Sequence, residues 1–162
     1  MLRSQKFEVG ITGTHSVRIP KEEALPFLEN GHSRVAFNAY FEGNEISFHG
    51  KLHQRNNEIL ISFGKRYQKE LCVTTSDFFQ LQIIEDTTTY GVEMPEELSA
   101  VLETDVKAFE RFNKLTDGKK RSLIYYILRI KNTQTRVDRA LMICENLTMG
   151  ITDLKQLVTS RR

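Results

Sequence analysis

The segment VAFNAYFEGNEISFHG, residues 35–50, alternates apolar side chains with others on both sides of the pair Gly43-Asn44. Alternation with a period of two places every second side chain on the same face of a β-strand. Glycine and asparagine tolerate the positive φ angles that a tight hairpin turn requires. The segment therefore predicts two antiparallel strands that share one buried face and are joined by a hairpin turn.

The same alternation continues on both sides of this hairpin. It recurs in residues 7–11, 17–19, 59–63 and 79–83, and Asn56-Asn57 supplies a second turn. Six short strands with a one-sided apolar face favour a closed sheet, because closure removes exposed edges. Two short helices interrupt the strands, one between Pro20 and Gly31 and the other over residues 65–71. Residues 1–86 are therefore predicted to form a small β-barrel domain with two inserted short helices.

After residue 86 the apolar period becomes helical. Pro95 opens the first predicted helix, and further apolar stripes follow in residues 106–112, 123–130 and 137–147. The capping-box pattern at residues 135–138 predicts that the fourth helix begins at Thr135, and Thr152 is placed to cap a last short helix. The second stripe consists of Val106, Phe109 and Phe112, and the fourth includes Leu141. Residues 87–162 therefore predict a bundle of four to five helices, and the whole chain an α+β fold.

Composition narrows the class of protein. The chain has 162 residues, of which 40% are hydrophobic and 27% charged, with a formal net charge of +2. These values are ordinary for a globular protein and argue against one built wholly around a polyanion. No apolar run approaches the roughly 20 residues of a transmembrane helix, and the first residues lack the apolar core of a secretory signal. Since Cys72 and Cys144 have no partners at ligand spacing, we expect a cytoplasmic protein with two reduced, mostly buried thiols.

Cations at two predicted helix starts form the strongest candidate site. A helix N-terminus carries a partial positive charge, so Lys and Arg there are locally unfavourable and indicate an anion, an acidic partner or a nearby carboxylate. Such side chains hold phosphate or carboxylate through charge-assisted hydrogen bonds. The alternative is a solvated face on which Arg136 or Arg139 bridges to a glutamate or a carbonyl within the bundle. The candidate anion- or partner-binding residues are Lys119, Lys120, Arg121, Lys131, Arg136 and Arg139.

The same region carries a resemblance to a known family. The positions concerned are Phe112, the turn at residues 116–121, Tyr126, Lys131, Thr135-Arg136 and Arg139. Together they resemble the C-terminal region of the bacterial YdeI/OmpD-associated family, also called bacteriocin-protection proteins. The resemblance implies a non-catalytic cytoplasmic binding or adaptor protein with a role in resistance to cationic peptides or envelope stress. It also implies that this role is exerted through a partner protein, and the basic helix starts predict that the partner is acidic or that the ligand is anionic.

The N-terminal half resembles the small β-barrel domain of unknown function that often precedes this segment. The matching pieces are residues 15–22 and 65–71. The first is also similar to the Ile-Pro-Lys-Glu signature of AbrB-like transcription factors, which implies a double-split barrel. It further implies an alternative function, nucleic-acid binding as a dimer, by Arg18, Lys21, Lys65, Arg66 and Lys69. Neighbouring glutamates weaken the attraction of these cations for phosphate. A third hypothesis is a barrel that binds a small ligand in its mouth.

The sequence offers little for metal binding or catalysis. His49 and His53 lie four residues apart in one predicted strand, and the rise of a strand separates them by roughly 13 Å, too far for one metal ion. His15 and His32 lie in turns without further residues at ligand spacing. No nucleophile elbow, HExxH pattern or glycine-rich phosphate loop occurs. We therefore expect no enzyme activity, no cofactor and no metal site, and both a monomer and a homodimer remain open.

Overall fold

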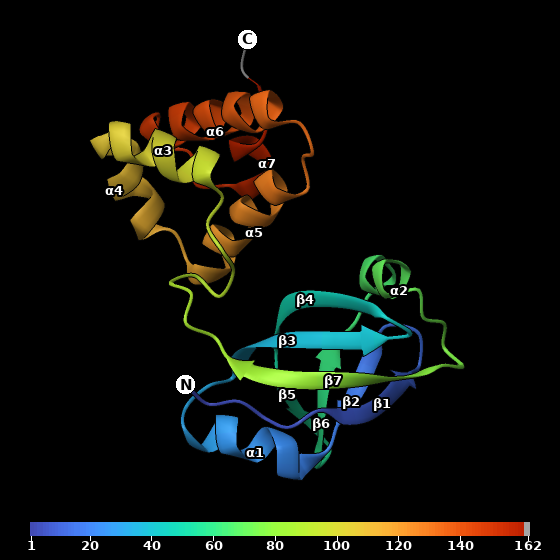
Figure 1. The fold of residues 1–162 in the computed structure, drawn as a ribbon. Helices are drawn as coiled ribbons and strands as arrows, with labels where there is room; N and C mark the ends of the chain where they lie inside the picture. Colours follow the sequence, from blue (N-terminus) through green and yellow to red (C-terminus); the bar gives the residue numbers. More distant parts are fainter. Residues whose placement is uncertain (161–162) are drawn as a thin grey trace. The chain divides into compact units, whose positions relative to one another are not determined.

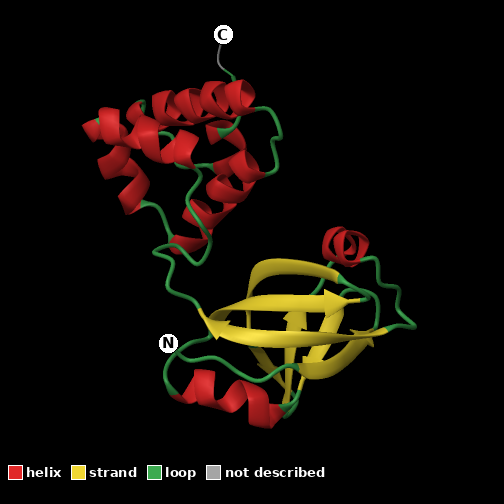
Figure 2. Cartoon of the chain, in the orientation of Figure 1, coloured by secondary structure: helices red, strands yellow, loops and turns green. Residues whose placement is uncertain are grey.

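The computed structural model describes residues 1–160 (Figure 1). The chain divides into two compact units, Met1–Thr87 and Thr88–Arg162, and each has its own cluster of buried apolar side chains. The first unit contains the strands and two helices, and the second contains only helices (Figure 2). The predicted α+β class is therefore confirmed.

The first unit is built on one antiparallel sheet of seven strands, in the spatial order β4-β3-β7-β1-β2-β6-β5. The alternation seen in the sequence decides which face is buried: in β3, Val35, Phe37 and Ala39 are buried and the residues between them are not. The strands are β1 (Phe7–Thr12), β2 (Ser16–Ile19), β3 (Arg34–Phe41), β4 (Asn44–Lys51), β5 (His53–Arg55), β6 (Glu58–Ser62) and β7 (Phe78–Glu85).

Two short helices, α1 (Lys21–Glu29) and α2 (Lys65–Leu71), interrupt the strands as predicted. Pro20 is the N-cap of α1, and Gly31, with φ of 80°, follows its end. Buried residues of both helices belong to the core of the sheet unit, among them Ala24 and Phe27 of α1 and Leu71 of α2. The inserted helices therefore help to cover the apolar face of the sheet.

The hairpin turns match the sequence prediction in one case and correct it in the other. Asn56 and Asn57 have φ of 49° and 66° and connect β5 to β6, as predicted. In the β3–β4 hairpin, Phe41 pairs with Asn44, so the turn residues are Glu42 and Gly43 and not Gly43 and Asn44. The predicted turn was displaced by one residue because Glu42 adopts φ of 46°, a conformation that favours Gly or Asn.

The seventh strand, β5, was not predicted. Its three residues are all exposed, so they carry no apolar alternation, and they form a strand by pairing with β6. Leu52 separates β5 from β4, so His49 and His53 lie on different strands, and their placement on one strand was wrong.

The sheet curls so that strands far apart in its order share one core. Phe48 of β4 and Phe63, which follows β6, have ring centroids 5.5 Å apart. Phe48 also stacks on Phe37 at 5.0 Å, and Phe63 stacks on Phe79 at 5.1 Å. The strand order begins at β4 and ends at β5 without closing hydrogen bonds between them in the described residues. The barrel and double-split descriptions therefore remain predictions.

The second unit packs its helices around Phe112, Ile124, Ile143 and other fully buried side chains. None of the helices in the described part of the chain is long and apolar enough to cross a membrane. Asn146 is a buried polar side chain in this unit, and its amide donates hydrogen bonds to carbonyls at the end of α7, including that of Leu157 at 2.9 Å. The helices are α3 (Glu96–Thr104), α4 (Val106–Lys114), α5 (Asp117–Leu128), α6 (Thr133–Thr148) and α7 (Leu154–Leu157).

Two predicted caps were wrong. Helix α6 begins at Thr133 because the side chain of Asn132 accepts a hydrogen bond from the Thr135 amide, which makes Thr135 already helical. Asp138, placed by the sequence in a capping box, instead accepts a hydrogen bond from Gln134. At α7 the cap is Asp153 and not Thr152. In consequence Arg136 lies in the first turns of α6 but not at its start.

The two cysteines differ in environment, which corrects the prediction of two mostly buried thiols. Cys144 is buried on α6, whereas Cys72 is exposed because it ends α2 in a left-handed conformation, with φ of 65°. Burial raises the pKa of the Cys144 thiol to about 12, and the nearby Asp105 carboxylate contributes to the increase.

The thiolate is the reactive form of cysteine, so the folded protein is expected to react with iodoacetamide at Cys72 and not at Cys144 near neutral pH. Mass spectrometry of digested protein measures the extent of alkylation at each site. The same reaction in denaturant serves as the control and should label both cysteines. Comparable labelling of Cys144 in the folded protein would contradict its placement in the core.

Candidate functional site

The cations at the start of α5 make contacts within their own unit. Thr116 caps the helix by accepting a hydrogen bond from the Lys119 amide. The Lys119 ammonium donates to the carbonyl of Thr152 at 2.8 Å. The Lys120 ammonium lies 3.8 Å from Asp117 Oδ1 and 5.8 Å from the centroid of the Tyr90 ring. These contacts hold both lysines against the surface of the helical unit.

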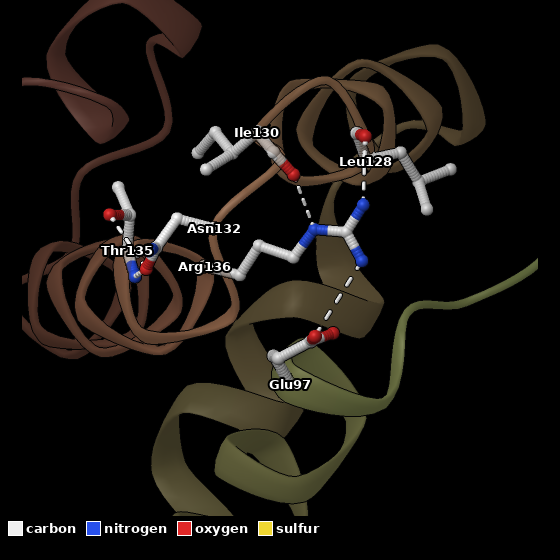
Figure 3. Close-up of polar contacts among 6 residues, drawn as sticks. All are labelled: Glu97, Leu128, Ile130, Asn132, Thr135 and Arg136. Carbon is white, nitrogen blue, oxygen red and sulfur yellow. Dashed lines mark hydrogen bonds and ion pairs between the residues drawn. The ribbon is translucent and has the colours of Figure 1, made fainter.

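Arg136 is engaged on three sides (Figure 3). Its Nε donates to the carbonyl of Ile130 at 2.6 Å and its Nη2 to the carbonyl of Leu128 at 3.1 Å. Its Nη1 lies 3.6 Å from Glu97 Oε1 on α3. The carbonyls at a helix C-terminus have no partner within the helix. Arg136 supplies donors there and thereby connects α6 to the end of α5 and to α3.

The six predicted site residues do not gather around one point. Lys119 lies near the start of α5, and Arg136 binds Leu128 at its end. A rise of about 1.5 Å per residue places these two positions roughly 13 Å apart. Lys131 and Arg139 are exposed, Arg139 on α6 and Lys131 in the loop before it. Arg121, beside the two lysines, is partly exposed. Binding of an anion by these residues remains a prediction. The start of α5 and the region around α6 would be two separate binding sites.

The predicted nucleic-acid-binding residues also have contacts within the chain. Arg18 pairs with Glu58 and Arg66 with Glu70, each at 3.2 Å. Lys21 donates to the side chain of Asn57 at 2.9 Å, and Lys65 lies 3.5 Å from the Gln68 side-chain oxygen. Lys69 is exposed. Because carboxylates accompany both arginines, this surface offers limited charge for releasing counterions from a polyanion.

Histidine–carboxylate pairs lie at the end of the sheet unit. His32 Nε2 is 3.0 Å from Glu85 Oε1, and His49 Nε2 is 3.7 Å from Asp86 Oδ1. A hydrogen bond from the Leu2 amide, together with the charge of His32, holds the pKa of Glu85 below its ordinary value. Among residues 1–160 no group of three or more His, Cys, Asp or Glu side chains is arranged to hold a metal ion.

An exposed apolar surface on the helical unit was not predicted. Val106 and Phe109 on α4 were expected to share a stripe with Phe112, and Leu141 on α6 to belong to the apolar stripe of its helix. In the structure Phe112 is fully buried. The exposed fractions of four other side chains are 71% for Val106, 44% for Phe109, 52% for Leu141 and 58% for Met149, which caps α6. We call these four residues the α4–α6 apolar surface.

A groove beside this surface separates the α3–α4 corner from α6. It is lined by Val101, Thr104, Asp105, Leu141, Cys144 and Glu145. Leu141 also lines a depression along α6 that extends to Met149. Leu141, Glu145 and Met149 follow each other at intervals of four residues, which places them along one side of α6. The signal in the sequence was the excess of apolar residues on α4, where Ala108 and Phe112 suffice to face the core.

The comparisons with known proteins address the helical unit alone. The family described as Bacteriocin-protection, YdeI or OmpD-Associated matches residues 91–150. No curated protein and no solved structure matches the chain, so the likeness of the sheet unit to AbrB-like regulators stays a prediction. The matched range contains α3 to α6, with Arg136, the lysines of α5 and the α4–α6 apolar surface. Residues 91–150 therefore match the bacteriocin-protection, YdeI or OmpD-associated family, as the spacing from Phe112 to Arg139 predicted.

Proposed function

We propose that this protein is a non-catalytic binding or adaptor protein that docks a partner protein on the α4–α6 apolar surface. The observation that carries the proposal is the exposure of large apolar side chains on both α4 and α6, two helices that pack against each other. In the described part of the helical unit, every exposed large hydrophobic side chain is one of these four residues. Single exposed apolar side chains are normal, whereas several gathered together and rimmed by polar residues mark interaction sites.

The groove indicates the chemistry of the partner. Asp105 and Glu145 contribute two carboxylates to its lining, which contains no lysine or arginine. Two neighbouring helices with a groove between them suit an amphipathic helix, whose apolar stripe fills the groove. Charge complementarity favours a helix with Lys or Arg beside that stripe. We therefore take the occupant to be a basic amphipathic helix of a partner protein.

The family description supports the biological context of this proposal. Its words, bacteriocin protection, fit a role in resistance to cationic peptides or envelope stress, exerted in the cytoplasm through a bound partner. The cations that lack a contact described above, Arg121, Lys131 and Arg139, are the candidates for an additional anionic group on that partner. The nucleic-acid alternative receives less support, because Arg18 and Arg66 have carboxylate partners.

Fluorescence anisotropy with a labelled helical peptide tests the docking surface. The probe has leucine at helical spacing on one face and lysine on the other. Truncation of an apolar anchor at the centre of an interface typically costs more than 1 kcal/mol. The double variant F109S/L141S should therefore bind at least about tenfold more weakly than the unmodified protein. The matched control is L25S, which removes an exposed leucine of α1 in the other unit.

Three results would count against the proposal. One is equal affinity of the double variant and the unmodified protein. Another is equal binding of a peptide in which glutamate replaces lysine, since the carboxylates of the groove should reject it. The third is absence of binding at low salt. Circular dichroism of each variant establishes that it is folded, and exposed positions were chosen because their substitution disturbs the core least.

A further inference from the structure

A row of polar and aromatic residues crosses β4, β3, β7 and β1, which are neighbours in the sheet (Figure 1). Tyr40 pairs with Glu45 on one side and with Gln80 on the other, and Gln80 pairs in turn with Glu8. Residues paired directly across strands project from the same face of a sheet. Glu8 and Glu45 therefore stand on the same face as Tyr40, although they are far apart in the sequence.

Phe78 extends this row toward the end of the sheet. It pairs with Gly10, and its ring lies over that glycine, so close that an added Cβ would lie 3.3 Å from it. The neighbouring Phe79 is buried in the core, whereas 69% of Phe78 is exposed. Because Gly10 has no side chain, the Phe78 ring lies directly over the backbone of that residue, on the solvent-exposed face of the sheet. This arrangement presents an aromatic ring to solvent.

These residues line a shallow cavity of about 530 Å³, to which the β3–β4 turn contributes Glu42. The lining contains three glutamates and no lysine or arginine. We call Glu8, Tyr40, Glu42, Glu45 and Phe78 the acidic aromatic face.

One cation of the chain itself contacts this face. The ammonium of Lys6 lies 3.9 Å from the centroid of the Tyr40 ring. Ammonium groups are attracted to the faces of aromatic rings by the ring quadrupole. Counted with Lys6, the three glutamates leave the face with a net negative charge. It therefore combines an exposed aromatic ring, a concave shape and an unbalanced negative charge.

We propose that the acidic aromatic face binds a basic peptide segment. Its lysine or arginine side chains pair with Glu8 and Glu45, and an apolar side chain packs on Phe78. Charge complementarity selects the basic peptide over an acidic one, and the ring adds an apolar contact that a simple polyamine would not use. This proposal does not rest on docking at the α4–α6 apolar surface, since the two surfaces belong to different units.

Anisotropy titrations with two labelled peptides test this proposal at low salt. One peptide alternates lysine with phenylalanine, and the other alternates lysine with glycine. The double variant E8Q/E45Q should weaken binding of both peptides by about tenfold, because it removes two charges without changing shape. The variant F78A should weaken only the phenylalanine-containing peptide, by a similar factor. The matched control, E22Q/E29Q, makes the same change in net charge on exposed residues of α1.

Each alternative outcome is distinct. Equal weakening by E8Q/E45Q and E22Q/E29Q would mean that only overall charge matters, and would overturn the proposal. So would an F78A effect on both peptides or on neither, or no binding by the unmodified protein. Loss of helical-peptide binding in F109S/L141S with these titrations unchanged would show that the two surfaces act separately. These variants alter exposed side chains, so near-unchanged melting temperatures are expected.

Discussion

Replacement of Arg136 by methionine is expected to lower the free energy of unfolding of the helical unit by about 3 kcal/mol. The substitution leaves the carbonyls of Leu128 and Ile130 without the donors that satisfy them. It also leaves the Glu97 carboxylate, whose side chain is only 13% exposed, without its cation. Methionine preserves much of the aliphatic stem, so lost packing contributes little. The penalty comes from polar groups that lose their partners while still shielded from water.

Thermal unfolding measures this effect, and for a unit of this size about 3 kcal/mol corresponds to a fall in Tm of roughly 12–24 °C. Amide hydrogen exchange should locate the loss in α3, α5 and α6, since the sheet unit has its own core. The matched control is R129M, which removes an exposed arginine at the C-cap of α5. Ordinary surface substitutions change the free energy of unfolding by less than about 0.5 kcal/mol. A change of that size in R136M would mean that the contacts of Arg136 are not needed for stability and that its guanidinium is available to bind an anion.

Arg136→Lys separates charge from geometry. An ammonium retains the attraction to Glu97 but lacks the planar fork that reaches two carbonyls and a carboxylate at once. We expect the lysine variant to recover less than half of the stability lost in the methionine variant. Full recovery would show that the charge alone is needed, and would contradict the role of the fork at the end of α5.

The sequence predicted those parts of the fold that depend on local pattern. The alternation in residues 35–50 gave β3 and β4, and the bounds of α2 agree with the prediction. The family was also predicted, because its motif is contiguous from Phe112 to Arg139. Local pattern failed at Arg136, since the true cap, Asn132, competes with an equally plausible Thr135. It failed at β5 because strand pairing there involves exposed residues only.

The α4–α6 apolar surface and the acidic aromatic face could not be predicted from the sequence for a different reason. Val106 and Phe109 have the same helical spacing as core residues, and the positions of the neighbouring helices α3 and α6 decide which stripe of α4 is covered. Glu8, Glu45 and Phe78 come from three strands, and they lie on one face because of the registers of β1, β4 and β7 with their neighbours. Register is set by the tertiary pairing of strands, so the sequence of a single segment does not predict this face.

Replacement of Gln68 by leucine is expected to destabilise the sheet unit by about 2 kcal/mol. Gln68 is a buried polar side chain, 4% exposed, and its Nε2 donates to the carbonyls of Thr14 and Phe63, both at 2.8 Å. These bonds connect α2 to the turn between β1 and β2 and to the end of β6. Leucine has a similar volume but no donor. Chemical denaturation measures the loss, and Q54L, at an exposed position of β5, is the control.

Gln68→Glu distinguishes lost hydrogen bonds from altered packing, because the carboxyl has the shape of the amide. Burial and the two carbonyl oxygens disfavour its ionised form, so the pKa of the introduced carboxyl should rise above its ordinary value of about 4.3. Below that ordinary value the carboxyl is neutral in both states. As pH rises toward the elevated pKa the folded state loses stability, and above it the full penalty applies.

The penalty relative to the unmodified protein should therefore be largest near neutral pH and shrink toward about pH 4, where the neutral carboxyl donates to one carbonyl. The measurement is best made with Lys65 replaced by glutamine in both proteins. Its ammonium lies 3.5 Å from Gln68 Oε1 and would favour the charged carboxyl. A penalty independent of pH would mean that packing, and not the pair of carbonyl acceptors, makes Gln68 necessary. A penalty that grew in acid would contradict the donor role altogether.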